Sequence, residues 1–494
     1  MPPSDAELPL YSAAQSRELD RRAIEQHGIP GYRLMNHAGG AAFAALRRHW
    51  PDARRIGVLC GAGNNAGDGY VLARLAAEAG YQVALCSLVD PGRLAGDARR
   101  AWQAARDAGL EVQPWRGRLP AGEVQVDALL GTGLQRELAG EWRAAVEALN
   151  AAATPVLAID IPSGLQADTG RVLGCAVRAE LTVTFIARKL GLYTGEGPEH
   201  AGRVLFDGLA VPSEVYREIV PLASLIGKRW VRDRLPPRPR TAHKGQCGRV
   251  LVVGGQPGMG GAALLAGSAA ARGGAGLVSV ATAPAHAAAL LAARPELMVH
   301  GVEGTMALRP LCQAADWLAL GPGLGQGAWG RTLWAAALGS GRPLVVDADA
   351  LNLLAAEPLR RDDWILTPHP GEAGRLLGCG AAAVQADRLA AVRELQARYG
   401  GVVLLKGAGT LIAAAEGVWL STSGNPGMAS GGMGDALTGL IAALAAQGQA
   451  PAVAATAGAW LHGAAGDRAA RGGERGLLAG DLIEALRGVL NEPA

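Results

Sequence analysis

The chain has few aromatic residues and little excess charge. Phe, Trp and Tyr make up 4% of its 494 residues, and the formal net charge is +3. A nearly balanced chain with no basic block interleaved with aromatics is not typical of a nucleic-acid-binding protein. Hydrophobic residues are 49% and charged residues 18% of the chain, which predicts a packed core rather than disorder.

Paired cysteines and long apolar runs are also missing. The six cysteines are far apart and form no CxxC pair, so neither a zinc ribbon nor a disulfide scaffold is predicted. No stretch of about 20 residues is free of polar interruption, as a membrane span would require. The first residues, MPPSDAELPL, lack the pattern of a signal peptide. We therefore expect a cytoplasmic protein without a nucleic-acid or membrane partner.

Two halves are predicted on either side of a basic, proline-rich segment, RDRLPPRPR at 232–240. In both halves, short apolar runs alternate with Ala- and Leu-rich helical runs, a pattern typical of parallel sheets covered by helices on both faces. The expected strands are 55–61, 81–88, 126–133, 155–162, 181–187, 249–255, 277–283, 317–323, 343–349, 364–370 and 401–407. The fold class is α/β, with two layered α/β domains at 1–225 and 243–494 and a linker at 226–242.

The loop TSGNPGMASGGMGDALTG at 422–439 has the composition of an anion site. Glycines let backbone N–H groups approach an anion closely, and the helix expected after them adds free N–H groups. Asp435 is either the N-cap of that helix or a base that deprotonates a hydroxyl attacking a nucleotide's terminal phosphate. A cap does not need six glycines around it, so we favour the base.

Other candidates follow predicted strands, whose carboxyl ends bind ligands in such folds. In CGAGNNAGDGYVLARLA, 60–76, a Gly/Asn loop precedes a helix and suits a phosphate, although neither G-x-G-x-x-G nor a Walker A motif is present. Asp127, Asp160 and Lys189 are expected to converge on one cleft. Lys406 ends an apolar strand, where a buried lysine needs an anionic partner. Asp347 and Asp349 either hold Mg²⁺ or cap the next helix near Asn352.

The second half resembles the ADP/ATP-dependent NAD(P)H-hydrate dehydratases, members of the ribokinase-like superfamily. The resemblance rests on HKGQCGRVLVVGG (243–255), GMGGAALLAGSAAARGGAG (258–276), GPGLG (321–325), DADALN (347–352), LTPHPGE (366–372), KGAGT (406–410) and GNPGMASGGMGD (424–435). It implies a ribokinase-like fold and the ADP- and Mg²⁺-dependent dehydration of NADHX and NADPHX, which are NADH and NADPH hydrated at C6 of the nicotinamide. It implies Asp435 as the base, with contacts to the hydrate from Ala262, Gly323, His369 and Asp435. The implied nucleotide-binding residues are Lys406, Gly407, Ala408, Gly409, Thr410 and Gly434.

Residues 10 to about 220 resemble the NAD(P)H-hydrate epimerases, which interconvert the R and S hydrates and have a Rossmann-like parallel sheet. The resemblance rests on LMNHAGGAAF (34–43), NNAGDG (64–69), GTGLQRE (131–137) and DIPSGLQADTG (160–170). It implies Asp160 as the main catalytic residue, Lys189 as its electrostatic helper, and a K⁺ site at Asn65, Asp127 and Ser163. The implied substrate-binding residues are Asn64, Asn65, Ala66, Gly67, Asp68, Gly131, Thr132, Gly133, Leu134, Gln135, Arg136, Glu137 and Asp160.

Ala66 departs from the epimerase loop, which reads N-N-G-G-D-G. Alanine is strained there if the position needs a positive φ, and harmless if it lies inside the helix. The order of the halves matches the bifunctional bacterial repair enzymes, and we expect a homo-oligomer. Two alternatives remain open: the second half as a vitamin or sugar kinase, and the first half as a binding module without catalysis.

Overall fold

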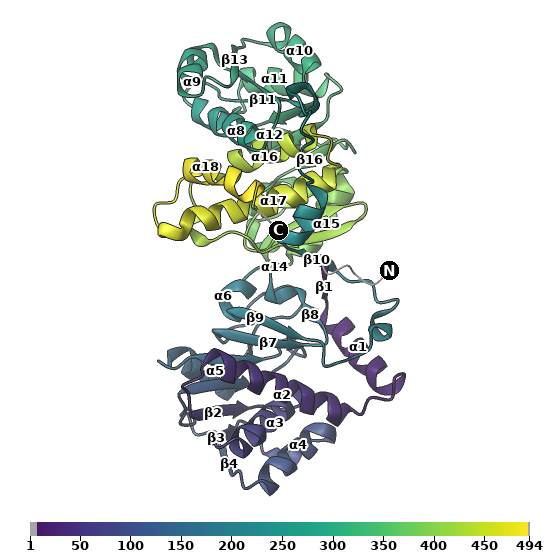
Figure 1. Cartoon of the computed structure of the whole chain (residues 1–494), viewed down its shortest axis with the longest axis vertical. Helices are drawn as coiled ribbons and strands as arrows, with labels where there is room; N and C mark the ends of the chain where they lie inside the picture. Colours follow the sequence, from purple (N-terminus) through teal and green to yellow (C-terminus); the bar gives the residue numbers. More distant parts are fainter. Residues whose placement is uncertain (1–6, 493–494) are drawn as a thin grey trace. The chain divides into compact units, whose positions relative to one another are not determined.

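The computed structural model describes residues 7–492. Two compact α/β units divide between Ala223 and Ser224, which confirms the fold class (Figure 1). The domain bounds stay a proposal. Helix α7 (Lys228–Arg234) lies within the proposed linker 226–242, and its Trp230 is buried in the core of the second unit.

The first unit is built on a parallel sheet whose strand order reverses at its centre. The chain enters at the central strand β2, adds β3 and β4 on one side, and then crosses to add β5, β6, β7 and β9 on the other. Ligands in such sheets bind outside the carboxyl ends of the strands at this reversal, which here lies between β2 and β5. In spatial order the strands are β4 (Val112–Pro114), β3 (Gln82–Ser87), β2 (Arg55–Cys60), β5 (Val124–Ala128), β6 (Val156–Ile159), β7 (Leu181–Phe185) and β9 (Arg203–Asp207).

Helices cover both faces of this sheet. Successive side chains of a strand point to opposite faces. Val58 and Cys60 pack with α1 (Ala13–Glu25), α2 (Gly31–His49), α3 (Asn64–Glu78) and α4 (Gly96–Asp107), whereas Leu59 packs with α5 (Gly140–Ala151). A further short pairing joins β1 (Glu7–Tyr11) to β8 (Arg188–Lys189) and so fixes the backbone of Lys189. The short helix α6 (Gly197–Ala201) precedes β9.

The second unit has a larger sheet, parallel over most of its width. Strands β17, β18 and β19 form an antiparallel meander, and the other pairs are parallel. The spatial order is β13 (Met298–Gly301), β12 (Leu277–Thr282), β11 (Arg249–Val253), β14 (Trp317–Leu320), β15 (Leu344–Val346), β16 (Trp364–Leu366), β17 (Val402–Leu405), β18 (Thr410–Ala414), β19 (Gly417–Ser421) and β10 (Ala223–Ile226).

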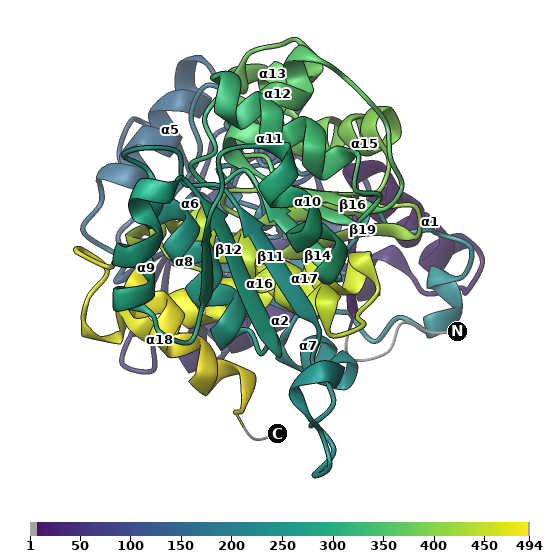
Figure 2. The same ribbon diagram turned by 90° about the horizontal axis from the view of Figure 1, so that it is seen from above.

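One face of this sheet packs against α8 (Gly260–Arg272), α16 (Met433–Ala446), α17 (Pro451–Ala469) and α18 (Ala479–Leu490). In Figure 2, α11, α12 and α13 lie at the upper edge of the unit and α18 at the lower, with β11, β12 and β14 between them. The remaining helices are α9 (Ala287–Ala293), α10 (Thr305–Ala314), α11 (Ala328–Leu338), α12 (Ala348–Ala356), α13 (Pro370–Leu377), α14 (Ala381–Ala386) and α15 (Arg388–Tyr399). Within residues 7–492, no helix combines the length and apolarity needed to cross a membrane.

All eleven predicted strands are confirmed, each with somewhat different ends. Eight strands were not predicted from the sequence: β1, β4, β8, β9, β10, β13 and the antiparallel strands β18 and β19. The antiparallel pairs at 402–421 depart from the parallel arrangement that the sequence pattern indicates.

Candidate active sites

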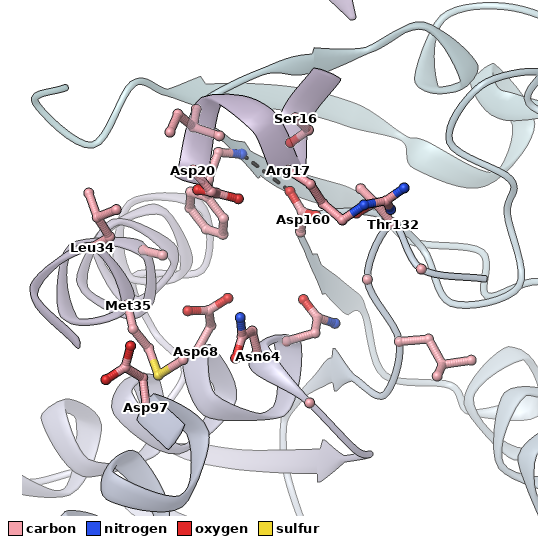
Figure 3. A pocket seen from close by; sticks show the side chains of 18 of the residues that line it. Ser16, Arg17, Asp20, Leu34, Met35, Asn64, Asp68, Asp97, Thr132 and Asp160 are labelled. Atoms are coloured by element: carbon pink, nitrogen blue, oxygen red, sulfur yellow. Dashed lines mark hydrogen bonds between the residues drawn. The ribbon is translucent and has the colours of Figure 1, made fainter. Parts of the chain in front are cut away.

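A cavity of about 820 Å³ lies in the first unit at the carboxyl ends of its strands (Figure 3). The structure brings most of the predicted substrate-binding and catalytic residues of this half to its walls: Asn64, Asn65, Asp68, Gly131, Thr132, Gly133, Leu134, Gln135, Arg136, Asp160 and Lys189. Ala66 and Gly67 are buried in α3 and do not line the cavity, and Glu137 does not line it either.

Lys189 and Asp160 form an ion pair at the cavity wall. The lysine is 1% exposed, and its ammonium also donates to Thr184 Oγ1 and to the carbonyl oxygen of Phe185, both at 3.0 Å. Asp160 has a φ of +69°, a left-handed conformation that costs a side-chain-bearing residue about 1 kcal/mol or more. Such strain is kept where the surroundings hold a functional group in place, and here it holds a carboxylate at a buried cation.

Three further carboxyl groups, those of Asp20, Asp68 and Asp97, line the same cavity. Burial raises the pKa of Asp20 to about 6, with Lys189 lowering it and Asp160 raising it. Burial also raises the pKa of Asp68 well above its usual value, helped by the charges of Asp160 and Asp20. Figure 3 shows Asp20 and Asp160 on one side of the cavity, with Asn64 and Asp68 across from them. Sequence reasoning missed Asp20 because α1 carries no motif that points to a ligand.

The residues implied as a K⁺ site lie at and below the cavity wall. Asp127 is fully buried and accepts hydrogen bonds from Ser163 N at 2.8 Å and Ser163 Oγ at 2.7 Å. Burial raises the pKa of Asp127 to about 6, although the hydrogen bonds from Ser163 lower it. Ser163 Oγ accepts from Leu130 N, and the next residue, Gly131, packs near Asn65. The side-chain amide of Asn65 is buried, and among the described residues neither its oxygen nor its nitrogen has a partner.

Helix α3 begins directly at the Gly/Asn loop. Its N-cap is Gly63, with a φ of +88°, so Asn64 and Asn65 belong to the first turn rather than to left-handed turns. Ala66 lies inside the helix and is not strained, which decides between the two readings of this departure. The loop from Gly61 to Ala66 has the spacing of the dinucleotide fingerprint with alanine in third place. Our exclusion of that fingerprint, which required a third glycine, was therefore too strict.

The site of the second unit is centred on Lys406. Its ammonium lies 2.7 Å from Asp347 Oδ1 and 3.8 Å from Glu372 Oε2. Thr438 of α16 donates to Asp347 Oδ2 at 2.8 Å. Burial would raise the pKa of Asp347, but the lysine and the threonine outweigh it and hold that pKa below its usual value. A Cβ on Gly434 would lie 3.3 Å from Lys406 Nζ, so this glycine keeps the lysine accessible from α16.

Asp435 lies in the first turn of α16 without capping it. The N-cap is Gly432, with a φ of +90°, and the helix has no side-chain cap. Burial raises the pKa of Asp435 to about 6, aided by Asp347 and opposed by Lys406. The cap alternative is thus wrong, and the half-buried carboxyl is free to accept a proton near neutral pH.

The other predicted residues of this half adjoin the same cluster. Ala262 lies on α8, which packs against α16, and a Cβ on Gly323 would be 3.2 Å from the Ala262 Cβ. His369 Nε2 lies 3.5 Å from Glu372 Oε1, and burial followed by the charge of Lys406 lowers the pKa of His369. Burial raises the pKa of Glu372 to about 7.

The two aspartates of the DADALN motif have separate tasks. Asp347 occupies the N-cap position of α12 by its backbone, but its carboxylate binds Lys406 and Thr438 instead of capping. Asp349 accepts from Gly325 N at 2.8 Å and so ties the GPGLG loop to α12. Asn352 accepts instead from Arg375. The alternative that these aspartates cap the helix near Asn352 is therefore wrong.

The KGAGT loop, 406–410, joins β17 to β18. Gly407 and Ala408 are exposed, whereas Gly409 is buried. Beneath the loop, the buried Arg388 donates to the carbonyl oxygens of Leu405, Lys406 and Gly409 at 3.3–3.4 Å. Arg388, Glu372 and Thr438 were not predicted. Glu372 and Thr438 lie inside quoted segments, LTPHPGE and the loop 422–439, but Arg388 comes from α15, outside them.

Each of the two α/β units has a partly buried lysine–aspartate pair and a glycine-led helix start at its carboxyl edge. These features define the class: an enzyme with two separate sites for anionic, nucleotide-like ligands. The family model described as NAD(P)H-hydrate dehydratase matches residues 250–487, and the one described as YjeF-related protein N-terminus matches residues 31–191.

Relatives with the same arrangement cover nearly the whole chain. A bifunctional NAD(P)H-hydrate repair enzyme of Coxiella burnetii is 49% identical over 98% of this chain and 99% of its own length. The Escherichia coli protein of that name is 44% identical over 98% and 94%. A solved ribokinase-like superfamily protein from Enterococcus faecalis is 30% identical, with a TM-score of 0.51, over 54% of this chain and 94% of that one. The chain therefore belongs to the family of bifunctional NAD(P)H-hydrate repair enzymes, as the sequence analysis expected.

Proposed function

We propose that the first unit epimerises R- and S-NAD(P)HX and that the second dehydrates S-NAD(P)HX with ADP, giving NAD(P)H, AMP and phosphate. The observation that carries this division is that each unit has a lysine–aspartate ion pair in which one partner is almost fully buried. Lys189 with Asp160, and Lys406 with Asp347, each lie at the carboxyl edge of their own unit's sheet. An ammonium next to carboxylates in such a partly buried site suits anionic substrates and proton transfer.

In the second unit, Asp435 removes the proton of the C6 hydroxyl as that oxygen attacks the terminal phosphoryl group of ADP. AMP leaves, and loss of phosphate from C6 and of a proton from C5 restores the ring double bond. The nucleotide phosphates are bound by Lys406, by the loop 407–410 and by Gly434. Ala262, Gly323 and His369 hold the hydrate. Mg²⁺ would bind together with the nucleotide, because it keeps several water ligands and needs few ligands from the protein. It would neutralise negative charge on the phosphates.

In the first unit, Asp160 is the main catalytic residue for epimerisation at C6, and Lys189, ion-paired to it, is its electrostatic helper. The start of α3 and the 131–137 loop bind the phosphates of the coenzyme. The orphaned Asn65 oxygen, with Asp127 and Ser163, fits a K⁺ ion, which takes neutral oxygens and a carboxylate. Bound there, K⁺ would supply positive charge near the substrate phosphates. Among residues 7–492, no three His, Cys, Asp or Glu side chains gather as a metal cluster.

The test of the dehydratase half uses purified S-NADHX with ADP, with ATP and without nucleotide, in Mg²⁺ buffer. We expect NADH absorbance to return with stoichiometric AMP and phosphate from ADP, and Asp435→Asn to slow this by about 10²–10⁴. Recovery independent of nucleotide would contradict the proposal, and phosphorylation of a vitamin or sugar would favour the kinase alternative. A homo-oligomeric state and a cytoplasmic location stay predictions.

A further inference from the structure

A second cavity, of about 570 Å³, opens on the first unit beside the loop that begins α3. It shares Ala62 and Gly63 with the larger cavity and extends over the end of β3, where Leu88, Val89, Asp90 and Arg93 form its wall. Nothing in the proposed chemistry uses these residues.

The strand order says which part of a dinucleotide belongs on each side of this loop. In sheets with this reversal, the pyrophosphate sits at the helix start after the central strand, and the two nucleoside halves lie over the strands on either side. Asp160 follows β6, and Lys189 lies in β8 just beyond β7, so the reacting nicotinamide lies over the β5–β6–β7 side. The other nucleoside must then lie over β3.

The second cavity has the chemistry that an adenosine needs. Leu88, Val89 and Leu94 offer apolar surface for a base. Asp90 follows the strand after the glycine loop, where an acidic residue binds the ribose in such folds. One of its carboxylate oxygens accepts from Gly92 N at 2.9 Å, which leaves the other for a hydroxyl group. The Arg93 guanidinium is exposed and forms no ion pair or hydrogen bond within residues 7–492.

We propose that this cavity binds the adenosine end of the hydrated coenzyme and that Arg93 binds the 2′-phosphate of NADPHX. The inference rests on the proposed epimerisation for the placement of the nicotinamide at Asp160. It names the adenosine subsite and a residue that selects between the two hydrates. A guanidinium is suited to a phosphate by its planar set of donors.

The experiment measures hydrogen exchange of segment 88–95 in the full chain, with ADP-ribose or 2′-phospho-ADP-ribose as the probe. We expect both probes to slow exchange there, and Ala95→Trp, which fills the cavity, to remove the effect. Arg93→Ala should weaken 2′-phospho-ADP-ribose about tenfold more than ADP-ribose. Arg99→Ala, an exposed arginine of α4 outside the cavity, is the matched control and should change neither.

Hydrogen exchange is measured for each segment and needs no turnover of substrate. The result therefore does not depend on whether the first unit has the proposed epimerase activity. Protection of 88–95 in a protein that does not epimerise would support the subsite and count against the epimerase proposal. Normal epimerisation without protection of 88–95 would overturn the subsite. Equal weakening of both probes by Arg93→Ala would overturn the role of Arg93.

Discussion

Asp435 and Asp160 are two aspartates at the starts of loops or helices, but their surroundings give them different properties. Asp435 faces Asp347 and Lys406 from a helix it does not cap, and burial raises its pKa to about 6. Asp160 is held in a left-handed conformation against a lysine that is 1% exposed. The first arrangement suits a base that takes up a proton, and the second suits a carboxylate fixed in place.

The pH dependence of dehydration follows from the Asp435 carboxyl. A base must be ionised, and a group with a pKa of about 6 loses its charge as the pH falls through that value. We expect kcat/KM for the hydrate to fall tenfold per pH unit below about 6. Asp435→Asn should lower kcat by about 10²–10⁴. Asp362→Asn, a change at an exposed aspartate, is the control. A profile that stays flat from pH 5 to pH 8 would contradict the role.

At the scale of elements, α3 and α16 repeat one design in the two units. Each begins behind a glycine in the left-handed region, Gly63 or Gly432, and each packs closely through an internal glycine. A Cβ on Gly69 of α3 would lie 2.5 Å from the Ala128 Cβ, and one on Gly439 of α16 would lie 1.9 Å from the Ala266 carbonyl oxygen. The internal glycines allow close packing, of α3 against β5 and of α16 against α8. This packing holds the N-terminal N–H groups of both helices at the edge of the sheet.

Substituting Gly439 tests this packing. Gly439→Ala forces α16 away from α8, and overpacking of a well-packed core costs about 1–3 kcal/mol. Gly480→Ala is the matched control, since a Cβ on this helical glycine of α18 meets nothing within 4 Å and alanine favours a helix. Thermal unfolding should show a lower midpoint for the first variant and an unchanged or higher midpoint for the second. Equal midpoints would refute the close-packing account.

Restoring the glycine of the epimerase loop tests the claim that alanine is unstrained at position 66. Because Ala66 is helical and fully buried, Ala66→Gly should destabilise the first unit by about 1 kcal/mol and bring no gain in epimerisation. Chemical denaturation and the epimerisation rate check the two parts. A faster variant of equal stability would mean that alanine impairs the natural loop.

At the scale of the whole molecule, the sequence predicted the features that are encoded locally. Buried parallel strands such as Val250–Val253 are continuous apolar runs in the sequence. The glycine-rich loops indicate binding sites by their composition alone. Strands β9 and β13 are not fully buried along their length, and both were missed. The hairpin of β18 and β19 lies outside the parallel pattern and was missed. Asp20 and Arg388 reach the sites from α1 and α15 through tertiary packing, which no motif records.

The division of labour between the units is the central claim, and one measurement tests it most directly. A mixture of R- and S-NADHX is given to the wild-type protein and to Asp160→Asn, with ADP, Mg²⁺ and K⁺, and the final NADH absorbance is compared. We predict that the wild type recovers all the hydrate faster than spontaneous epimerisation allows. The variant should match its initial rate and stop at the S fraction. Full recovery by the variant at the wild-type rate, or a wild type that stops at the S fraction, would contradict the account.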